Sequence, residues 1–364
     1  MRNGWKPLFL MILILALLFC FAACAGQEQP PAGDSQAGQL GEAETPAEET
    51  SAEAGTVYPL TLMDQAGREV TLAAEPERIV SGYYISSSAC IALGLTDRLA
   101  GIEAKADTRN IYALSAPQLL ELPNVGSAKE FDLEGCIALE PDLVILPKKL
   151  ADAAETMTGL GIPVMLVNPE SHEELTAMIN LLATATNTQA KADALISYYE
   201  QALLEVNGLI AAAEKPRVYM AGNSAYLSTA PKDMYQGALI ESAGAINAAA
   251  EIDGNSWTDI SYEQLLALNP DIIIIPSEAS YTADDIRNDS QLSLVTAVAG
   301  NAIYQMPTAF EPWDSPTPSG ILGLKWLLSV VHPDLYTLEQ VQEDVVSFYA
   351  DFYGFQADPA QVGK

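Results

Sequence analysis

A long amphipathic stretch near the middle of the chain, Thr188 to Lys215, determines much of the expected fold. Its apolar residues alternate in steps of four and three, which is the pattern of one buried helix face. These residues are Leu195, Tyr199, Ala202, Val206, Leu209 and Ala213. Asn187 can cap the start of this helix, and Pro216 stops it from continuing. A helix over residues 188–213 would be about 35–40 Å long, because each residue adds about 1.5 Å.

The same short pattern occurs once before and once after this helix. Residues 133–147 read LEGCIALEPDLVILP, and residues 262–276 read YEQLLALNPDIIIIP. Each copy predicts a short helix, a turn at the Pro-Asp pair and then a buried strand. A long helix between two matching units indicates two lobes joined by that helix.

Strands and helices alternate on both sides of the long helix, beginning with a hairpin whose turn contains Gly67. Such alternation is typical of parallel sheets covered by helices on both faces. We therefore predict an α/β fold of two lobes, each with a central and mostly parallel sheet, joined by one long helix. The predicted segments are a signal peptide (1–24), a tether (25–55), an N-terminal lobe (56–186), the connecting helix (187–215) and a C-terminal lobe (216–364).

The N-terminal segment has the features of a lipoprotein export signal. Two basic residues precede an apolar run from Pro7 to Phe21. Residues 21–24 (FAAC) resemble a bacterial lipobox, so Cys24 is the predicted lipidation site, and a plain membrane-anchor helix is the alternative. Residues 25–55 carry almost no large apolar side chains, which predicts a disordered tether with a reach of roughly 30 Å. Both interpretations place the rest of the chain outside the cytoplasm.

The composition argues against several classes of protein. The formal net charge is −31, so the chain has no excess of cations to neutralise nucleic-acid phosphates. His172 and His332 are the only two histidines, and neither has a His or Cys partner at metal-ligand spacing. The same scarcity argues against Ser-His and Cys-His catalysis. Cys90 and Cys136 lie among apolar residues, where we favour small core residues over the alternative of a disulfide.

Ligands of open parallel α/β sheets lie beyond the carboxyl ends of the strands, and this rule selects the candidate ligand-binding residues. They are Tyr83, Tyr84, Lys105, Arg109, Lys148, Asn223, Ser277 and Trp313. Basic residues recur in this set although the chain is strongly acidic, which indicates an anionic ligand; a solvated loop is the alternative for Lys148. Residues 311–319 contain three prolines, so we expect a stiff loop that presents Trp313 as a flat wall, with ordinary packing as the alternative.

Glu134 and Glu263 occupy the same place in the two copies of the repeated pattern, each early in a predicted helix. A carboxylate in that place complements the helix dipole. A matched pair of carboxylates on two lobes can also bind a symmetric partner.

The sequence resembles the class III periplasmic binding proteins of ABC importers, which handle ferric siderophores, haem, cobalamin and, in some members, molybdate or tungstate. The resemblance covers residues 57–355. It is carried by the repeated pattern and by three motifs, DQAGREV (64–70), PERIV (76–80) and WDSPTP (313–318). It implies a ligand cleft between the lobes and a small hinge motion. It also implies that Glu134 and Glu263 dock onto arginines of the paired permease subunits.

The resemblance favours an extracytoplasmic receptor, anchored to the bacterial membrane by lipid, that delivers an iron chelate to a permease. The chelate would be a ferric siderophore or a haem- or cobalamin-like compound. Such a receptor is a monomer, is not an enzyme, needs no cofactor and holds no metal directly; it serves an ABC permease dimer with a cytoplasmic ATPase. The alternative within this fold is a molybdate or tungstate receptor. A secreted α/β hydrolase is disfavoured, because no Gly-x-Ser-x-Gly motif is present.

Overall fold

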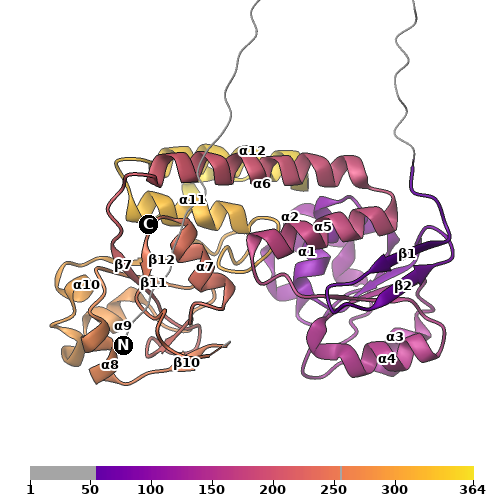
Figure 1. The fold of residues 1–364 in the computed structure, drawn as a ribbon, viewed down its shortest axis with the longest axis horizontal. Coiled ribbons are helices and arrows are strands. Elements are labelled where there is room, and N and C mark those ends of the chain that lie inside the picture. The colour runs from indigo at the N-terminus through magenta and orange to yellow at the C-terminus, as the bar shows by residue number, and fades with distance from the viewer. Residues whose placement is uncertain (1–54, 255) are drawn as a thin grey trace, which may run out of the picture. The chain divides into compact units, whose positions relative to one another are not determined.

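The computed structural model describes residues 55–254 and 256–364. These residues form two α/β lobes, which Figure 1 shows below the helices α6 (Gln189–Ile210) and α12 (Leu338–Tyr353). The predicted signal peptide, Cys24 and nearly all of the predicted tether lie outside the described residues. Within the described ranges, no helix combines the length and the hydropathy that a membrane crossing requires.

The first lobe contains a four-stranded parallel sheet with the order β4-β3-β5-β6. Its strands are β3 (Ile79–Ser81), β4 (Leu99–Gly101), β5 (Leu143–Pro147) and β6 (Val164–Val167), and a separate hairpin consists of β1 (Leu60–Met63) and β2 (Glu69–Leu72). Its helices are α1 (Tyr84–Ala92), α2 (Asn110–Ser115), α3 (Leu133–Ala138), α4 (Ala151–Gly159) and α5 (His172–Thr186). Every residue of β5 is buried, as expected for an apolar strand with helices on both faces of its sheet.

The second lobe repeats this arrangement with the order β12-β11-β7-β9, again with all pairs parallel. Its strands are β7 (Arg217–Met220), β9 (Ile246–Asn247), β11 (Ile272–Ile275) and β12 (Ile303–Gln305), with a small pair formed by β8 (Ser228–Thr229) and β10 (Thr258–Asp259). Its helices are α7 (Tyr235–Ser242), α8 (Tyr262–Leu268), α9 (Ala283–Arg287), α10 (Thr296–Ala299) and α11 (Gly320–Val331). Numbered within each lobe, both four-stranded sheets have the strand order 2-1-3-4. The predicted two-lobed α/β fold is confirmed.

The Pro-Asp turn of the repeated pattern has a structural role, which is first seen in the N-terminal lobe. The carboxylate of Asp142 accepts hydrogen bonds from the backbone N–H groups of Glu77 and Arg78, both at 2.9 Å. The side chain of Arg78 donates from Nε to the carbonyl oxygen of Leu139, at the end of α3. These bonds connect the chain just before β3 to the turn that leads from α3 into β5.

The C-terminal lobe has the same set of contacts. The carboxylate of Asp271 accepts from the backbone N–H of Arg217 at 2.8 Å. The guanidinium of Arg217 donates to the carbonyl oxygen of Leu268 from Nε and Nη2, at 3.3 and 3.2 Å. We call each set, Arg78 with Asp142 and Arg217 with Asp271, an Arg–Asp clamp.

The helix α6 lies within the predicted range 188–213. Its buried residues are Ala192, Leu195, Tyr199, Ala202 and Val206. Four of them belong to the predicted apolar face, Ala192 was not predicted, and the last two predicted members are not among them. The hydroxyl of Tyr199 donates to the carbonyl oxygens of Thr317 and Pro318, and it accepts from the N–H of Ile321 at 3.2 Å. These bonds attach the connecting helix to the loop that precedes α11.

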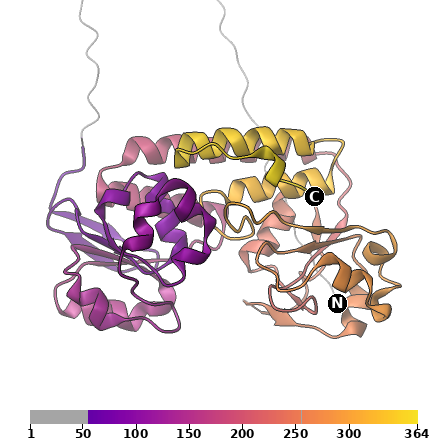
Figure 2. The same ribbon diagram turned by 180° about the vertical axis from the view of Figure 1, so that it is seen from behind.

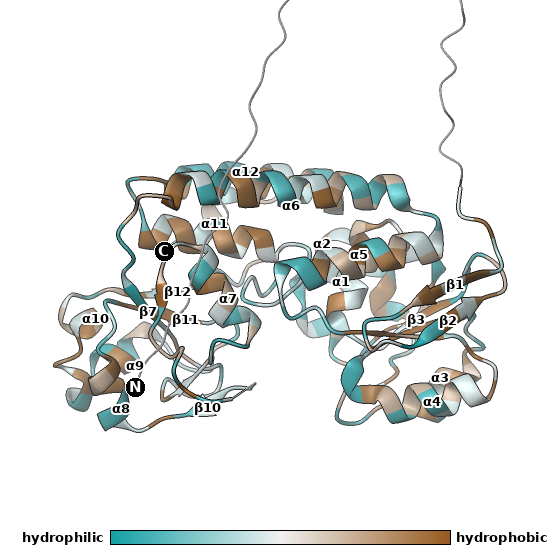
Figure 3. Ribbon diagram, in the orientation of Figure 1, coloured by the Kyte–Doolittle hydropathy of each residue, from teal (hydrophilic) through white to brown (hydrophobic). Residues whose placement is uncertain are grey.

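One hydrophobic core extends through the first lobe, α6, α11 and α12. The ring of Tyr198 on α6 lies 5.3 Å from that of Phe348 on α12, and Figures 1 and 2 both show these two helices side by side. All residues of α11 are buried, which agrees with its largely hydrophobic sequence (Figure 3). Cys90 and Cys136 are buried free thiols, so the expectation of small core residues is confirmed.

Candidate ligand-binding site

Loops that follow two strands of each lobe meet around the guanidinium of Arg109. Arg109 follows β4 and directly precedes α2, whereas Tyr84 follows β3 and is the first residue of α1. From the second lobe, Glu278 follows β11 and Ser315 follows β12. The chain therefore brings the ends of strands from both lobes to one site, as the rule for parallel sheets predicts.

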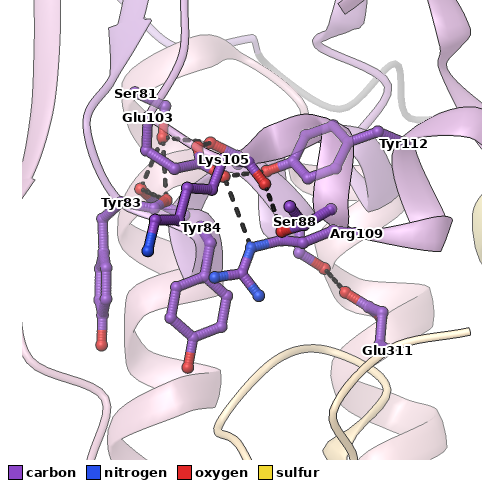
Figure 4. Close-up of polar contacts among 12 residues, drawn as sticks. Ser81, Tyr83, Tyr84, Ser88, Glu103, Lys105, Arg109, Tyr112 and Glu311 are labelled. Atoms are coloured by element: carbon purple, nitrogen blue, oxygen red, sulfur yellow. Dashed lines mark hydrogen bonds and ion pairs between the residues drawn. The ribbon is translucent and has the colours of Figure 1, made fainter. Parts of the chain in front are cut away.

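Tyr84 supports Arg109 from one side. The central carbon of the guanidinium lies 4.1 Å from the centre of the Tyr84 ring, a cation–π contact (Figure 4). The Tyr84 hydroxyl donates to Oγ of Ser315 in the other lobe at 3.1 Å. Burial raises the pKa of Tyr84 to about 12, so its phenol stays protonated at neutral pH and keeps this donor. Tyr83 packs edge-on against Tyr84, with 5.4 Å between ring centres.

Glu103 lies behind Arg109 and is buried, with 5% of the residue exposed. Its carboxylate accepts from Oγ of Ser87 at 2.6 Å and from the hydroxyl of Tyr112 at 2.5 Å. Its Oε1 lies 4.0 Å from Nε of Arg109. Burial raises the pKa of Glu103, and the two hydroxyl donors and Arg109 oppose that rise. Glu103 therefore places a buried carboxylate behind the guanidinium, but Nε of Arg109 donates no hydrogen bond to it.

The other end of the guanidinium faces the second lobe. Nη1 of Arg109 donates to Oε1 of Glu278 at 3.3 Å, and this ion pair joins residues of different lobes. The side chain of Arg109 is 17% exposed, whereas that of Glu278 is 56% exposed. The pair thus consists of a fixed cation and a carboxylate that is largely in solvent.

Two further carboxylates of the second lobe are buried near this pair. Oε1 of Glu311 accepts from Oγ of Ser88 in the first lobe at 2.6 Å, and its Oε2 accepts from Oγ of Ser319 at 2.5 Å (Figure 4 shows the Ser88 contact). Asp314 accepts from the hydroxyl of Ser277 and, at 3.3 Å, from its N–H. Burial raises the pKa of Glu311 and of Asp314, and hydrogen bonds from hydroxyl groups oppose the rise.

A cavity of about 160 Å³ opens at this site. Its lining from the first lobe consists of Thr108, Arg109 and Asn110, and its lining from the second lobe consists of Ser277, Glu278, Thr308, Phe310, Glu311 and Pro312. The amide of Asn110 also donates to the carbonyl oxygen of Ala309 across the lobes at 2.9 Å. One cation, two carboxylates, three hydroxyls and one aromatic ring therefore surround a small space between the lobes.

The structure brings together four of the eight predicted ligand-binding residues. Arg109 and Ser277 line the cavity, Tyr84 contacts Arg109, and Tyr83 contacts Tyr84. Each of these four residues follows a strand of its sheet, as the strand-end rule predicts.

The predicted positive rim is not assembled at this cavity, because Arg109 is the only cation among the described residues that line it. Lys105 and Lys148 are exposed and do not line it, although Lys105 lies on the same side as Tyr83 (Figure 4). Asn223 also lies outside the lining; its Oδ1 is buried without a hydrogen-bond partner among the described residues. A solvated loop was the alternative interpretation for Lys148, and its exposure agrees with that alternative.

The expectation that a stiff loop presents the ring of Trp313 to the ligand is wrong. Trp313 is 1% exposed. Its indole stacks on Phe310 with 6.5 Å between ring centres, and its Nε1 donates to the hydroxyl of Tyr349 at 3.0 Å. The loop folds back onto α11 so closely that the carbonyl of Trp313 leaves no space for a Cβ at Gly323. Packing of the indole against aromatic side chains stabilises the fold more than exposure of the ring to solvent would.

The sequence prediction missed several residues that line the cavity. Thr108 and Asn110 adjoin Arg109, and Glu278 adjoins Ser277, so the strand-end rule applied to neighbouring positions would have included them. Thr308 and Phe310 follow β12 by a few residues, and no sequence pattern distinguishes them from ordinary loop residues.

The two carboxylates predicted to dock onto a permease are exposed. Glu134 lies in the first turn of α3, and Glu263 lies in the first turn of α8. Figure 1 shows α3 and α8 in different lobes, both on the side away from α6. Within residues 55–254 and 256–364, no group of three His, Cys, Asp or Glu side chains is arranged to hold a metal ion.

Comparison with known proteins identifies several relatives. The molybdate-binding protein MolA of Haemophilus influenzae is 25% identical over 83% of this chain and 93% of its own. An uncharacterized ABC transporter substrate-binding lipoprotein of Bacillus subtilis, YvrC, is 27% identical over 77% of this chain and 88% of its own. A cobalamin-binding protein of Halobacterium salinarum is 26% identical over 83% of this chain and 76% of its own.

The comparisons also establish the family. A solved periplasmic solute binding protein from Veillonella parvula is 26% identical, with a TM-score of 0.72 over 83% of this chain and 95% of its own. The family described as periplasmic binding protein matches residues 79–309, which is more than half of the chain. The chain therefore belongs to the periplasmic binding protein family, in the class whose two α/β lobes are joined by one long helix, and is the substrate-binding protein of an ABC transporter.

Proposed function

We propose that the cavity around Arg109 captures a compact oxyanion of the molybdate or tungstate type and that the protein delivers it to the permease of an importer. The observation that carries this proposal is the fixed guanidinium between the lobes. The ring of Tyr84 packs against it, the carboxylate of Glu103 lies 4.0 Å from its Nε, and its Nη1 already binds an anionic group, the carboxylate of Glu278. A planar guanidinium held in place matches oxyanions, because it can offer two parallel N–H donors.

The size of the cavity supports a compact ligand. Its volume of about 160 Å³ is below the roughly 300–1,000 Å³ that pockets for drug-sized ligands usually have. A tetrahedral oxyanion is smaller than such ligands, whereas a siderophore, haem or cobalamin is as large or larger. The similarity to a molybdate-binding protein over most of both chains agrees with this choice.

The remaining polar groups of the cavity suit the same ligand. Thr108 and Ser277 contribute hydroxyls from opposite lobes. Both carboxylate oxygens of Glu103 and of Glu311 accept hydrogen bonds from hydroxyl groups. Neither carboxylate therefore takes a hydrogen bond from Arg109 that a ligand could accept. No step of this function breaks or forms a covalent bond in the ligand. The protein binds and releases, and ATP is hydrolysed by another component.

A metal chelate, the ligand favoured by the sequence, is the second candidate. The adjacent rings of Tyr83 and Tyr84 beside the site favour it, since aromatic side chains provide walls for a large ligand. A cobalamin-binding protein is among the relatives. A ligand of that size requires the lobes to separate beyond the present cavity and the contact between Tyr84 and Ser315 to break.

We also propose that Cys24 carries the lipid anchor and that Glu134 and Glu263 dock onto the permease. The lipobox-like sequence supports the first assignment, and one of the relatives is a lipoprotein. The exposure of both glutamates, in matching places of the two lobes, supports the second.

Titration calorimetry of the purified protein tests the ligand class. The panel contains molybdate, tungstate, sulfate, a ferric siderophore, haem and cobalamin. Saturable one-to-one binding of molybdate or tungstate, with weaker binding of the lighter sulfate, is the expected result. Binding of only an iron chelate, haem or cobalamin would reject the oxyanion and establish the second candidate.

A further inference from the structure

Glu278 differs from the other carboxylates at the site in how it is held. Glu103 and Glu311 are buried, and hydroxyl donors occupy both oxygens of each. The side chain of Glu278 is 56% exposed. Among the residues that the structure describes, Arg109 is the only group that donates a hydrogen bond to its carboxylate.

The position of Glu278 is also the position that an anion needs. Its Oε1 lies 3.3 Å from Nη1 of Arg109, within the lining of the cavity. Nε of the same guanidinium faces the buried carboxylate of Glu103 at 4.0 Å and donates no hydrogen bond to it, so a negative charge already lies on that side. An oxyanion that binds the Nη1 edge of the guanidinium takes the place of Glu278, because like charges cannot share one donor edge without strong repulsion.

We propose that Glu278 is an internal competitor for Arg109. In the unliganded protein its carboxylate bridges the lobes through the guanidinium, and it turns into solvent when an anion binds. This inference rests on the proposed function, since it assumes an anionic ligand at Arg109. The movement costs little free energy, because ion pairs with an exposed partner are weak.

The competitor also provides selectivity. A ligand must interact with Arg109 more strongly than a carboxylate does before it can enter, so weakly held anions are excluded. A neutral ligand gains nothing from the exchange, because it leaves the cation without a counter-charge.

Substitution of the competitor tests the inference. Glu278→Gln keeps the size of the side chain and removes its charge, so we expect molybdate or tungstate to bind roughly 3- to 10-fold more tightly at low salt, as the competing pair and the repulsion are lost. The matched control is Glu241→Gln, an exposed residue at the end of α7 in the same lobe, with the same change in net charge. Its affinity is expected to stay within 2-fold of the wild-type value, because the charge lies outside the cavity.

The outcomes separate the two proposals. If the wild-type protein binds an oxyanion and Glu278→Gln binds it equally or more weakly, the competition is rejected and the oxyanion receptor stands. If both variants gain affinity alike, the effect is one of overall charge, and the competition is again rejected. If the wild-type protein binds neither molybdate nor tungstate, the proposed function fails, and the competition fails with it.

Discussion

At the residue scale, the buried carboxylates of the candidate site are stabilised mainly by hydroxyl groups. The carboxylate of Glu311 accepts hydrogen bonds from the hydroxyls of Ser88 and Ser319. The carboxylate of Asp314 accepts one from the hydroxyl of Ser277. A buried acceptor that loses its donor is costly, because water cannot replace the missing bond. The bond from Ser88 also joins the two lobes, so it contributes both to stability and to the alignment of the site.

Removal of that hydroxyl gives the first prediction. We expect Ser88→Ala to lower the free energy of unfolding by about 1–3 kcal/mol, because Oε1 of Glu311 loses its donor from the first lobe. Urea unfolding followed by circular dichroism measures the change. The control is Ser347→Ala on the exposed side of α12. An equal loss of unfolding free energy in both variants would show that the contact between Ser88 and Glu311 does not stabilise the fold.

His172 provides a prediction on pH. Its ring lies beside Tyr199 and Tyr235, and neither ring nitrogen has a hydrogen-bond partner among the described residues. Burial lowers the pKa of His172 to about 4, from 6.5 in an unfolded chain. The unfolded state therefore takes up a proton first as the pH falls. His172 is without effect above pH 6.5 and destabilises the fold progressively between pH 6.5 and 4, by about 3 kcal/mol in all.

Comparison with His172→Phe isolates this contribution. The buried carboxyl groups also titrate, but they do so in both proteins and cancel in the difference between the two unfolding free energies. We expect that difference to shift in favour of the variant by about 2–3 kcal/mol between pH 7.5 and pH 4.5. A difference that is constant over this range would show that His172 is not held neutral by burial.

The sequence predicted part of the site, and physical reasons separate the successes from the failures. Arg109, Ser277 and Tyr84 follow strands, and chain geometry alone brings such residues to the edge of a parallel sheet. Trp313 also follows a strand, yet its ring is buried. The ring packs against side chains that include Tyr349 of α12, which comes later in the chain, so its burial depends on tertiary contacts. Glu311 and Glu278 have opposite environments, and this depends on tertiary contacts that no local pattern encodes.

At the scale of elements, the Arg–Asp clamps explain why the Pro-Asp turn recurs. In each lobe an aspartate that precedes a central strand holds the backbone that leads into its neighbour, and an arginine of that neighbour binds the end of a short helix. The alternation of strands and helices was predictable from periodicity. The two-residue strands β8 and β10 were not, since segments of that length carry no period.

The clamps predict equivalent effects in the two lobes. We expect Asp142→Ala to lower the unfolding free energy by about 2–3 kcal/mol, because two backbone N–H groups lose a charged acceptor. Asp271→Ala is expected to lower it by less, because only one backbone N–H group loses its acceptor there. Thermal and urea unfolding measure both. Asp253→Ala, at an exposed position, is the control. A larger loss for Asp271→Ala than for Asp142→Ala would contradict the count of bonds.

At the scale of the whole described structure, two lobes with equivalent sheets share one hydrophobic core through α6, α11 and α12. A core shared in this way limits how far the lobes can separate, because separation would expose apolar surface. The small hinge motion that the sequence resemblance implied stays a prediction. As long as this motion is small, the distance between the exposed Glu134 of α3 and Glu263 of α8 stays nearly constant.

Docking gives the prediction for the transport cycle. We expect the double variant Glu134→Ala and Glu263→Ala to bind its ligand with unchanged affinity and to lose uptake, because neither residue lies in the cavity and both are exposed. Calorimetry measures the first quantity, and uptake of labelled molybdate by cells that express the complete transporter measures the second. Reduced ligand affinity in the double variant would reject the docking role.

The central claim is that Arg109 binds the ligand, and calorimetric titration of Arg109→Gln with molybdate and tungstate tests it most directly. The loss of charge-assisted hydrogen bonds predicts an affinity about 100-fold lower than that of the wild-type protein. Arg287→Gln, which removes the same charge from an exposed helix of the second lobe, is expected to bind as the wild type does. Oxyanion binding that Arg109→Gln leaves intact would contradict the account.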